Sequence, residues 1–338
     1  MFVDLHSDTG TRPTAAMREA IAAAEVGDEQ LGEDPTTRAL EARVSALLGQ
    51  EHAVFLPTGS MANKVALATL TSPGDSVICD DRAHVFQFEA GGPAVVAGVL
   101  MAPIPSARGW FTADELRPRF SPPSNYKSHT SVVSLEQTHN FAGGVVWPLE
   151  AWDGVIAATR AFGASVHVDG ARLLNAVVAS GTPADRWAAG VDSVWIDLSK
   201  GLGCPGGAVL AGSSDFVREA TRWKYRVGGA LRQSGMLAAA GLYALDHNVE
   251  RLADDHANAR RLAEGLSALG CAVEAPETNM VFFDPSPTGV TIDELVAGLR
   301  KLDVRMTPVA GRIRAVTHLD VDAGAIERAL GAAAEVLG

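Results

Sequence analysis

Short apolar runs alternate with amphipathic segments along residues 37–212 of the chain. A short apolar run is typical of a buried strand, and apolar residues spaced three and four apart indicate a helix. The pattern predicts strands at 53–56, 76–79, 131–135, 165–168, 193–198 and 207–212, with helices at 37–48, 61–71 and 149–162. Strands that alternate with helices indicate an α/β fold, a mainly parallel sheet covered by helices on both faces.

The rest of the chain has a different order of elements. The pattern predicts helices at 14–24, 215–223, 236–266, 291–302 and 323–337, and strands at 272–274, 280–283 and 312–317. We therefore expect an N-terminal arm (1–15), a large domain (16–245) and a small α+β domain (246–338). Residues 27–35 are rich in acids and turn formers and predict a loop.

Lys200 follows the predicted strand 193–198 directly and precedes a loop rich in glycine and proline. The carboxyl ends of strands are where α/β sheets build their sites. Burial there favours the neutral amine of a lysine, which attacks aldehydes. The alternative is a surface lysine that ends a strand. Lys200 alone does not distinguish a catalytic lysine from a surface lysine, so the other candidate residues of the chain are needed.

Gly201, Gly203 and Gly206 also match the dinucleotide-binding pattern G-x-G-x-x-G. That pattern requires a helix after the glycines. Pro205 interrupts it here, and an apolar strand follows. A dinucleotide site is therefore excluded.

Thr58, Gly59 and Ser60 connect a predicted strand to a predicted helix. Small residues at a helix N-terminus can bind an anion, because free backbone N–H groups and the helix dipole face it. The alternative is a simple helix cap made by Ser60. The lysine of a Walker loop is missing from this segment.

Three further residues carry candidate chemistry. Asp169 and Arg172 come directly after the predicted strand 165–168 and form either part of a site or an ion pair at a strand end. His84 has aromatic neighbours and Glu89 close by, and a carboxylate can orient an imidazole ring. A structural role is the alternative for this histidine.

Composition narrows the class of protein. The chain has 338 residues, of which 47% are hydrophobic, and a net charge of −12. An acidic chain does not favour a nucleic-acid or membrane-surface partner. Its three cysteines (Cys79, Cys204 and Cys271) are scattered without metal-ligand spacing, so we expect no metal site and a reducing compartment. The N-terminus does not resemble a signal peptide, and no apolar run approaches membrane-spanning length, so we expect a cytoplasmic protein.

A strand-end lysine, a strand-end acid and an anion-binding helix N-terminus together fit pyridoxal phosphate. This cofactor needs a lysine that binds it covalently, a cradle for its phosphate, and an acid that keeps its ring nitrogen protonated.

The sequence resembles the low-specificity L-threonine aldolases, pyridoxal-phosphate enzymes with a fold like that of aspartate aminotransferase. The matching stretches run in order through nearly the whole chain: DLHSDTGTRPT (4–14), LPTGSMAN (56–63), AHVFQFEAGG (83–92), SLEQTHN (134–140), HVDGARLLNA (167–176), LSKGLG (198–203), RQSG (232–235) and VTHLD (316–320).

The resemblance implies a role for each matching residue. Lys200 holds the cofactor, Asp169 pairs with its ring nitrogen, and His84 stacks on the ring. Thr58, Gly59 and Ser60 bind the phosphate, which Arg232 reaches across a subunit interface. Ser7, Arg172 and Arg314 hold the substrate carboxylate. The implied reaction cleaves β-hydroxy-α-amino acids to glycine and an aldehyde, in dimers or tetramers that share active sites.

Three positions depart from the family pattern. His6 stands where arginine is usual, Leu31 where tyrosine is frequent, and Tyr126 where a pocket histidine is frequent, with His129 three positions on. Leu31 and Tyr126 then line the path of the substrate side chain and make it more apolar. The base that takes the β-hydroxyl proton is His84, His129, Tyr126 or a bound water. Alternative functions are another pyridoxal-phosphate activity (a β-eliminating lyase or an amino-acid racemase) and a non-catalytic cofactor-binding protein.

Overall fold

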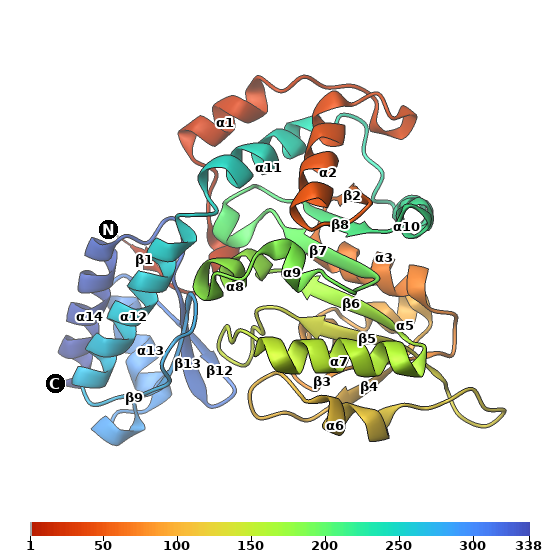
Figure 1. Cartoon of the computed structure of the whole chain (residues 1–338). Coiled ribbons are helices and arrows are strands. Elements are labelled where there is room, and N and C mark those ends of the chain that lie inside the picture. The colour runs from red at the N-terminus through yellow and green to blue at the C-terminus, as the bar shows by residue number, and fades with distance from the viewer. Residues whose placement is uncertain (1) are drawn as a thin grey trace.

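The computed structural model describes residues 2–338, and a seven-stranded sheet forms the centre of its larger part (Figure 1). The strand order is β2-β8-β7-β6-β5-β3-β4, where β8 is antiparallel to both neighbours and the other pairs are parallel. The strands are β2 (His52–Leu56), β3 (Ser76–Asp80), β4 (Leu100–Ile104), β5 (Thr130–Glu136), β6 (Ser165–Gly170), β7 (Ser193–Asp197) and β8 (Ala208–Gly212). The predicted mainly parallel sheet is confirmed.

Helices cover both faces of this sheet because successive strand residues point to opposite sides. In β7, Trp195 packs on one face and Ile196 on the other. The first face is covered by α3 (Gly59–Leu70), α5 (Gly92–Ala97) and α10 (Ser214–Arg226). The second is covered by α2 (Pro35–Leu47), α7 (Leu149–Phe162), α8 (Leu173–Ser180), α9 (Ala184–Trp187) and α11 (Gly235–His247).

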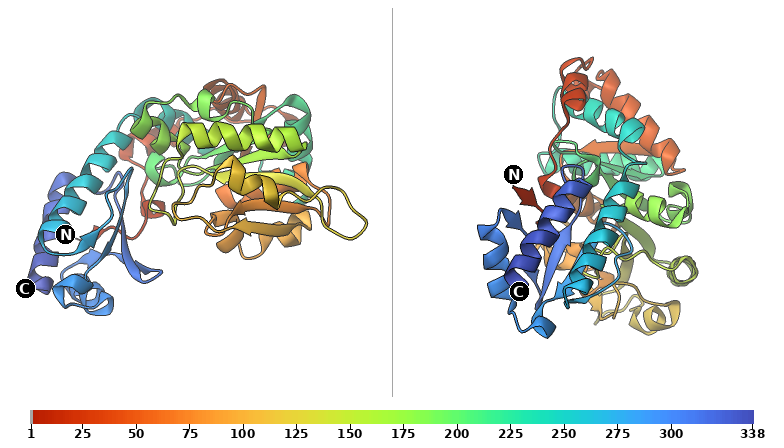
Figure 2. Two further views of the ribbon diagram at one scale, coloured as in Figure 1. Left: turned by 60° about the horizontal axis from the view of Figure 1, so that its bottom comes forward. Right: turned by 90° about the vertical axis from the view of Figure 1, so that its left-hand side faces the viewer.

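The smaller part is built on an antiparallel sheet with strand order β12-β13-β10-β9. Its elements are α12 (Leu252–Ala268), β9 (Ala272–Val273), β10 (Met280–Asp284), α13 (Ile292–Lys301), β11 (Val304–Arg305), β12 (Thr307–Val309), β13 (Arg312–Val316) and α14 (Ala323–Leu337). Figure 2 shows the helices of this part side by side at one end of the molecule.

The N-terminal segment joins the smaller part. β1 (Val3–Asp4) pairs in parallel with β11, and Leu5 is fully buried in the same apolar core. The N-terminal segment then leads from the smaller part toward the large sheet.

Short helices follow or connect the main elements: η1 (Asp8–Gly10), α1 (Ala15–Ala22), η2 (Glu29–Leu31), α4 (His84–Gln87), α6 (Ala113–Leu116), η3 (Arg117–Arg119), η4 (Lys200–Leu202) and η5 (Ser286–Thr288).

One predicted element is wrong. The single helix predicted at 236–266 is two helices, α11 and α12, because the helix is interrupted at 248–251. The Asn248 side chain donates a hydrogen bond to the Leu202 carbonyl (2.7 Å), which holds this break against the loop that follows Lys200. Among the described residues, no helix combines the length and the apolar character needed to cross a bilayer.

Candidate active site

A cavity of about 360 Å³ lies at the carboxyl ends of β5, β6 and β7. Parallel strands bring their carboxyl ends to one edge of the sheet, where α/β folds bind ligands. Most predicted site residues line this cavity: Ser7, Thr58, Gly59, Ser60, His84, Asp169, Arg172, Lys200 and Arg314. The topology therefore brings together residues that are up to 307 positions apart.

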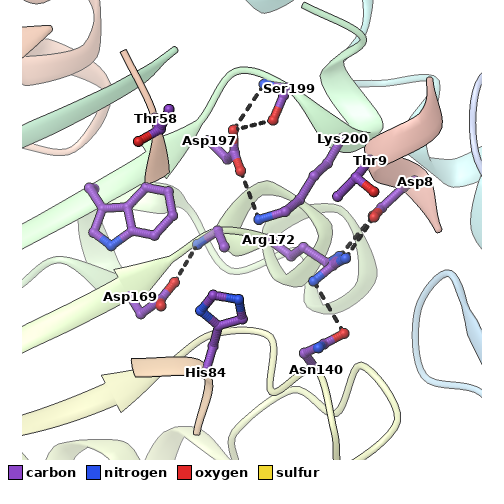
Figure 3. A network of polar contacts seen from close by, with 12 residues as sticks. Asp8, Thr9, Thr58, His84, Asn140, Asp169, Arg172, Asp197, Ser199 and Lys200 are labelled. Atoms are coloured by element: carbon purple, nitrogen blue, oxygen red, sulfur yellow. Dashed lines mark hydrogen bonds and ion pairs between the residues drawn. The ribbon is translucent and has the colours of Figure 1, made fainter. Parts of the chain in front are cut away.

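Lys200 begins the short helix η4, just beyond the end of β7. Its Nζ lies 2.7 Å from Oδ2 of Asp197, and the other oxygen of Asp197 accepts hydrogen bonds from the backbone N–H and the hydroxyl of Ser199. Figure 3 shows the lysine side chain between the Asp169–His84 side and the Arg172–Asp8 side of the site. The backbone of Lys200 is left-handed (φ +57°), a strained conformation for a residue with a side chain and one that is frequent at functional sites.

Asp169 is held in place at the end of β6. Its Oδ1 accepts a hydrogen bond from the backbone N–H of Ala171 (3.1 Å), and its Oδ2 accepts one from Asn63 Nδ2 (2.7 Å). The carboxylate is buried and lines the cavity. It can therefore bind a protonated nitrogen in the cavity in a fixed orientation.

His84 is oriented by two glutamates. Its backbone N–H donates to Glu136 (2.7 Å), and its ring Nδ1 lies 3.2 Å from Glu89 Oε1. Burial lowers the pKa of His84, but the hydrogen bond with Glu89 and the charges of Asp169, Glu136 and Glu89 outweigh burial and raise the pKa above its ordinary value. With Nδ1 bonded to Glu89, Nε2 is the ring nitrogen left for a ligand.

Two arginines form the other side of the cavity. Arg172 donates from Nε and Nη2 to the two oxygens of buried Asp8 (2.8 and 2.6 Å). Arg314 donates from Nη2 to the His6 carbonyl (3.2 Å) and from Nη1 to Asn140 (3.3 Å). Burial lowers the pKa of Arg314, and Arg172 lowers it further. No carboxylate among residues 2–338 forms an ion pair with Arg314, whose Nε is buried without a hydrogen-bond acceptor. This guanidinium is therefore available to an incoming carboxylate.

The N-terminus of α3 opens onto the same cavity. Thr58 caps the helix by accepting a hydrogen bond from the Met61 N–H (3.2 Å). A Cβ atom on Gly59 would lie 2.5 Å from the Trp195 ring, so glycine lets the helix approach β7 this closely. The first N–H groups of a helix lack intrahelical partners, so this end can bind an anion.

Four predicted residues lie outside this cavity within one chain. Arg232 pairs with Asp28 (2.9 Å), with 61% of its side chain exposed. Leu31 is 70% exposed and Tyr126 is 95% exposed. The loop before β5, which carries Tyr126, projects at the end of the molecule away from the C-terminal helices (Figure 2).

His129 lies at the amino-terminal end of β5, whereas Lys200 lies beyond the carboxyl end of β7, so the two are on opposite ends of the parallel strands. The Nδ1 atom of His129 is 3.3 Å from Asp75. A role for any of these four residues in the cavity requires a second copy of the chain, so their roles remain predictions.

Sequence reasoning missed several residues that hold the site together: Asp8, Asn63, Glu136, Asn140 and Asp197. Asn63 gave one signal, because it is a polar residue among apolar positions of a predicted helix. Asp197 precedes the lysine by three positions in a buried strand. Asp8 gave none, since its partner lies 164 positions away.

The comparisons with known proteins agree with this geometry. The family model described as beta-eliminating lyase matches residues 4–286. The low specificity L-threonine aldolase of Escherichia coli K12 is 42% identical over 321 residues, 95% of each chain. Low-specificity L-threonine aldolase 1 of Arabidopsis thaliana is 38% identical over 325 residues, 94% of this chain and 91% of that one. The chain belongs to the beta-eliminating lyase family and, within it, to the low-specificity L-threonine aldolases.

Solved structures confirm the predicted fold. The threonine aldolase of Leishmania major has a TM-score of 0.86 at 18% identity and covers 99% of both chains. An aspartate aminotransferase of Thermus thermophilus has a TM-score of 0.74 at 16% identity, over 99% of this chain and 96% of that one. The chain thus has an aspartate-aminotransferase-like fold.

Proposed function

We propose that the protein uses pyridoxal phosphate to cleave L-threonine, L-allo-threonine or a related β-hydroxy-α-amino acid to glycine and an aldehyde. The observation that carries this proposal is the convergence of Lys200, Asp169, the α3 N-terminus and two arginines on one cavity. The identity to low-specificity L-threonine aldolases over 95% of the chain supports it.

The donor set fits the cofactor. Lys200 offers an amine for the aldehyde, and the free N–H groups of Gly59 and Ser60, with the Thr58 and Ser60 hydroxyls, offer a phosphate site. Asp169 offers a carboxylate for the ring nitrogen, and we infer that Arg232 of a second copy adds a positive charge at the phosphate. The bound cofactor supplies an electron sink for the bond that breaks.

The chain's own residues then position the substrate. Arg314 and Arg172 bind the substrate carboxylate, with the Ser7 hydroxyl beside them. Asp8 occupies Nε and Nη2 of Arg172, so the Nη1 side of the guanidinium, 3.5 Å from Asn140 Oδ1, is the side left for the substrate. With the carboxylate held by these residues and the amino group held at the cofactor, the bond to the β-carbon can be oriented toward the electron sink.

A base must accept the β-hydroxyl proton. Of the three side chains considered, His84 lines the cavity, whereas His129 and Tyr126 lie outside it in one chain. We infer that Nε2 of His84, or a water molecule that it holds, takes this proton. Its raised pKa makes it a stronger base than an ordinary histidine.

We also infer a cytoplasmic homo-oligomer, a dimer or tetramer with shared sites. The three cysteines are free and buried, as suits a reducing compartment. Arg232 and Leu31 are both exposed. The loops that carry them lie side by side, because the Glu29 N–H donates a hydrogen bond to the Arg232 carbonyl (2.7 Å). A second copy that packs on these loops could carry both residues to its partner's cavity.

Product analysis tests the proposal. Purified protein with added pyridoxal phosphate is incubated with L-threonine, L-allo-threonine and phenylserine, and glycine, aldehyde, ammonia and keto acid are quantified. Glycine with an equal amount of aldehyde supports the proposal. The family model's description makes β-elimination the second candidate. Ammonia with a keto acid would indicate β-elimination, and a substrate with inverted configuration at its α-carbon would indicate racemisation. Either result would contradict our proposal.

A further inference from the structure

Asn63 lies between the two carboxylates of the site and uses its whole side-chain amide there. It is on α3 and only 1% exposed. Its Nδ2 donates to Glu89 Oε1 (2.6 Å) and to Asp169 Oδ2 (2.7 Å). Its Oδ1 accepts from Trp195 Nε1 (2.7 Å) and lies 3.0 Å from His167 Nε2. A side-chain amide has two N–H donors and two acceptor sites, so its capacity is filled.

The partners determine which way the amide points. Indole Nε1 can only donate and the oxygen of an ionised carboxylate can only accept, so the oxygen must face Trp195 and the nitrogen must face the acids. Burial lowers the pKa of His167 to about 4, and this ring is therefore neutral at pH 7. Because Asn63 Oδ1 can only accept, Nε2 of this ring carries the proton, and the Ser193 hydroxyl, 2.8 Å from Nδ1, donates to Nδ1. A flipped amide would place an oxygen between two carboxylates.

The two carboxylates serve different parts of the site. Glu89 faces Nδ1 of His84, and Asp169 faces the cavity from the end of β6. One ring nitrogen of His84 and one carboxylate oxygen from each of Glu89 and Asp169 all lie within 4.8 Å of one another. Like charges this close repel, and the N–H donors of one amide oppose that repulsion by bonding to both.

We propose that Asn63 is a positioning residue for the reaction. It acts through Asp169, whose orientation it fixes toward the cofactor ring nitrogen, and through Glu89, which orients the His84 ring. This inference rests on the proposed function, because it assumes that pyridoxal phosphate binds with its ring nitrogen at Asp169.

The variant Asn63→Asp tests the inference with little change in shape. It keeps an acceptor for Trp195 and His167 but replaces both donors with an oxygen beside Glu89 and Asp169. Losing hydrogen bonds to charged groups should weaken the binding of pyridoxal phosphate to the apoprotein by about 10- to 100-fold. We expect kcat to fall at least as much, with little change in the KM for the amino acid, since the arginines are untouched.

A direct readout separates positioning from a structural role. The ¹⁵N resonance of pyridoxal phosphate labelled at its ring nitrogen reports whether that nitrogen is protonated. In Asn63→Ala, which removes the same donors without adding a negative charge beside the ring nitrogen, it should move from the protonated toward the unprotonated position, as it should in Asp169→Asn.

The matched control is Asn175→Asp, which also places a new acid at a buried asparagine, on α8 and 3.2 Å from His256. It should leave the resonance and the cofactor affinity unchanged.

The outcomes distinguish the two proposals. A wild-type cofactor affinity in Asn63→Asp together with a wild-type resonance in Asn63→Ala overturns the inference, even if the variants are less stable. If one of the two variants does not fold, the other is tested by both measurements, with the resonance of Asn63→Asp read for a change of position in either direction. A wild-type protein that binds pyridoxal phosphate but forms no glycine refutes the proposed reaction, while the resonance still decides the role of Asn63. A wild-type protein that does not bind the cofactor overturns both.

Discussion

Both oxygens of Asp8 accept hydrogen bonds from Arg172, at 2.8 Å from Nε and 2.6 Å from Nη2. Asn279 Nδ2 also donates to Asp8 (3.2 Å). Burial raises the pKa of Asp8, but Arg172 outweighs burial and holds it well below its usual range. One carboxylate therefore joins the N-terminal segment, the large sheet and the smaller part at an arginine that lines the cavity.

Asp8→Asn should lower the free energy of unfolding by about 3–5 kcal/mol, because it leaves a buried guanidinium without its counter-ion. Arg172→Gln should cost a similar amount, and the double variant should cost less than the sum of the two. Urea unfolding at neutral pH measures all three. As a control, Asp320→Asn removes the partner of Arg12, whose side chain is 82% exposed, and should cost under about 1 kcal/mol. Additive single effects would show that the Asp8–Arg172 pair is not coupled.

Lys200 should carry the cofactor. The purified protein should be yellow with bound pyridoxal phosphate, and borohydride should fix the cofactor on Lys200, which peptide mass spectrometry can locate. Lys200→Ala should retain the fold but lose the covalent label. Label on Lys224, which is buried against Glu29, or on Lys64 would contradict the assignment.

Glu41→Gln should stabilise the protein at high pH and not at low pH. Burial raises the pKa of Glu41 from 4.5 to about 6, although the Phe55 N–H donates to its Oε1 (2.8 Å). The folded protein keeps this proton up to about pH 6, whereas the unfolded chain loses it near pH 4.5. The cost of ionisation is therefore absent below pH 4.5 and complete above pH 6, where the amide should gain about 2 kcal/mol.

Urea unfolding of the wild type and of Glu41→Gln, at pH values on either side of this window, measures the difference. The control is Glu51→Gln, since hydrogen bonds from Ser214 lower the pKa of exposed Glu51, and its loss should not stabilise the protein at high pH. An equal gain for Glu41→Gln at both pH values would contradict the burial argument.

Leu31 and Tyr126 should influence the choice of substrate only through a second copy of the chain. If they reach a partner's cavity, their apolar character favours phenylserine over threonine in kcat/KM by about 1–3 kcal/mol. The double variant Leu31→Tyr, Tyr126→His should then shift the ratio toward threonine. Leu100→Tyr, at another exposed leucine, is the control and should leave the ratio unchanged. A ratio that stays constant in the double variant would show that these positions do not set specificity.

The sequence pattern located the large sheet because its strands are apolar runs between clear turns. The helix predicted at 149–162 coincides with α7, where a proline precedes and a glycine follows the apolar pattern. β4 was not predicted, because Pro103 and half-exposed residues at a sheet edge weaken the apolar signal. The break between α11 and α12 has no glycine or proline and depends on the tertiary contact of Asn248 with Leu202.

The site was predictable only where chemistry and strand ends coincide. Lys200 and Asp169 each follow an apolar strand, so their position in the sheet could be inferred. Asp8 and Asn63 act through partners 164 and 106 positions away, and no local pattern encodes such a contact. The family resemblance supplied Arg314, and the structure then showed that it lines the cavity.

The pairing of β1 with β11 joins residues about 300 positions apart, and this has a consequence for the newly made chain. As the ribosome releases the polypeptide, the segment with Asp8 emerges first, long before Asn279, β11 and Arg314. A nascent chain that has passed β8 already holds Lys200, Asp169 and the Asp8–Arg172 pair, but β1 still lacks β11 and Asp8 still lacks Asn279. Lys200 and Asp169 are therefore in place well before the rest of the cavity, and an unfinished chain lacks Arg314 and the strand that anchors its N-terminal segment.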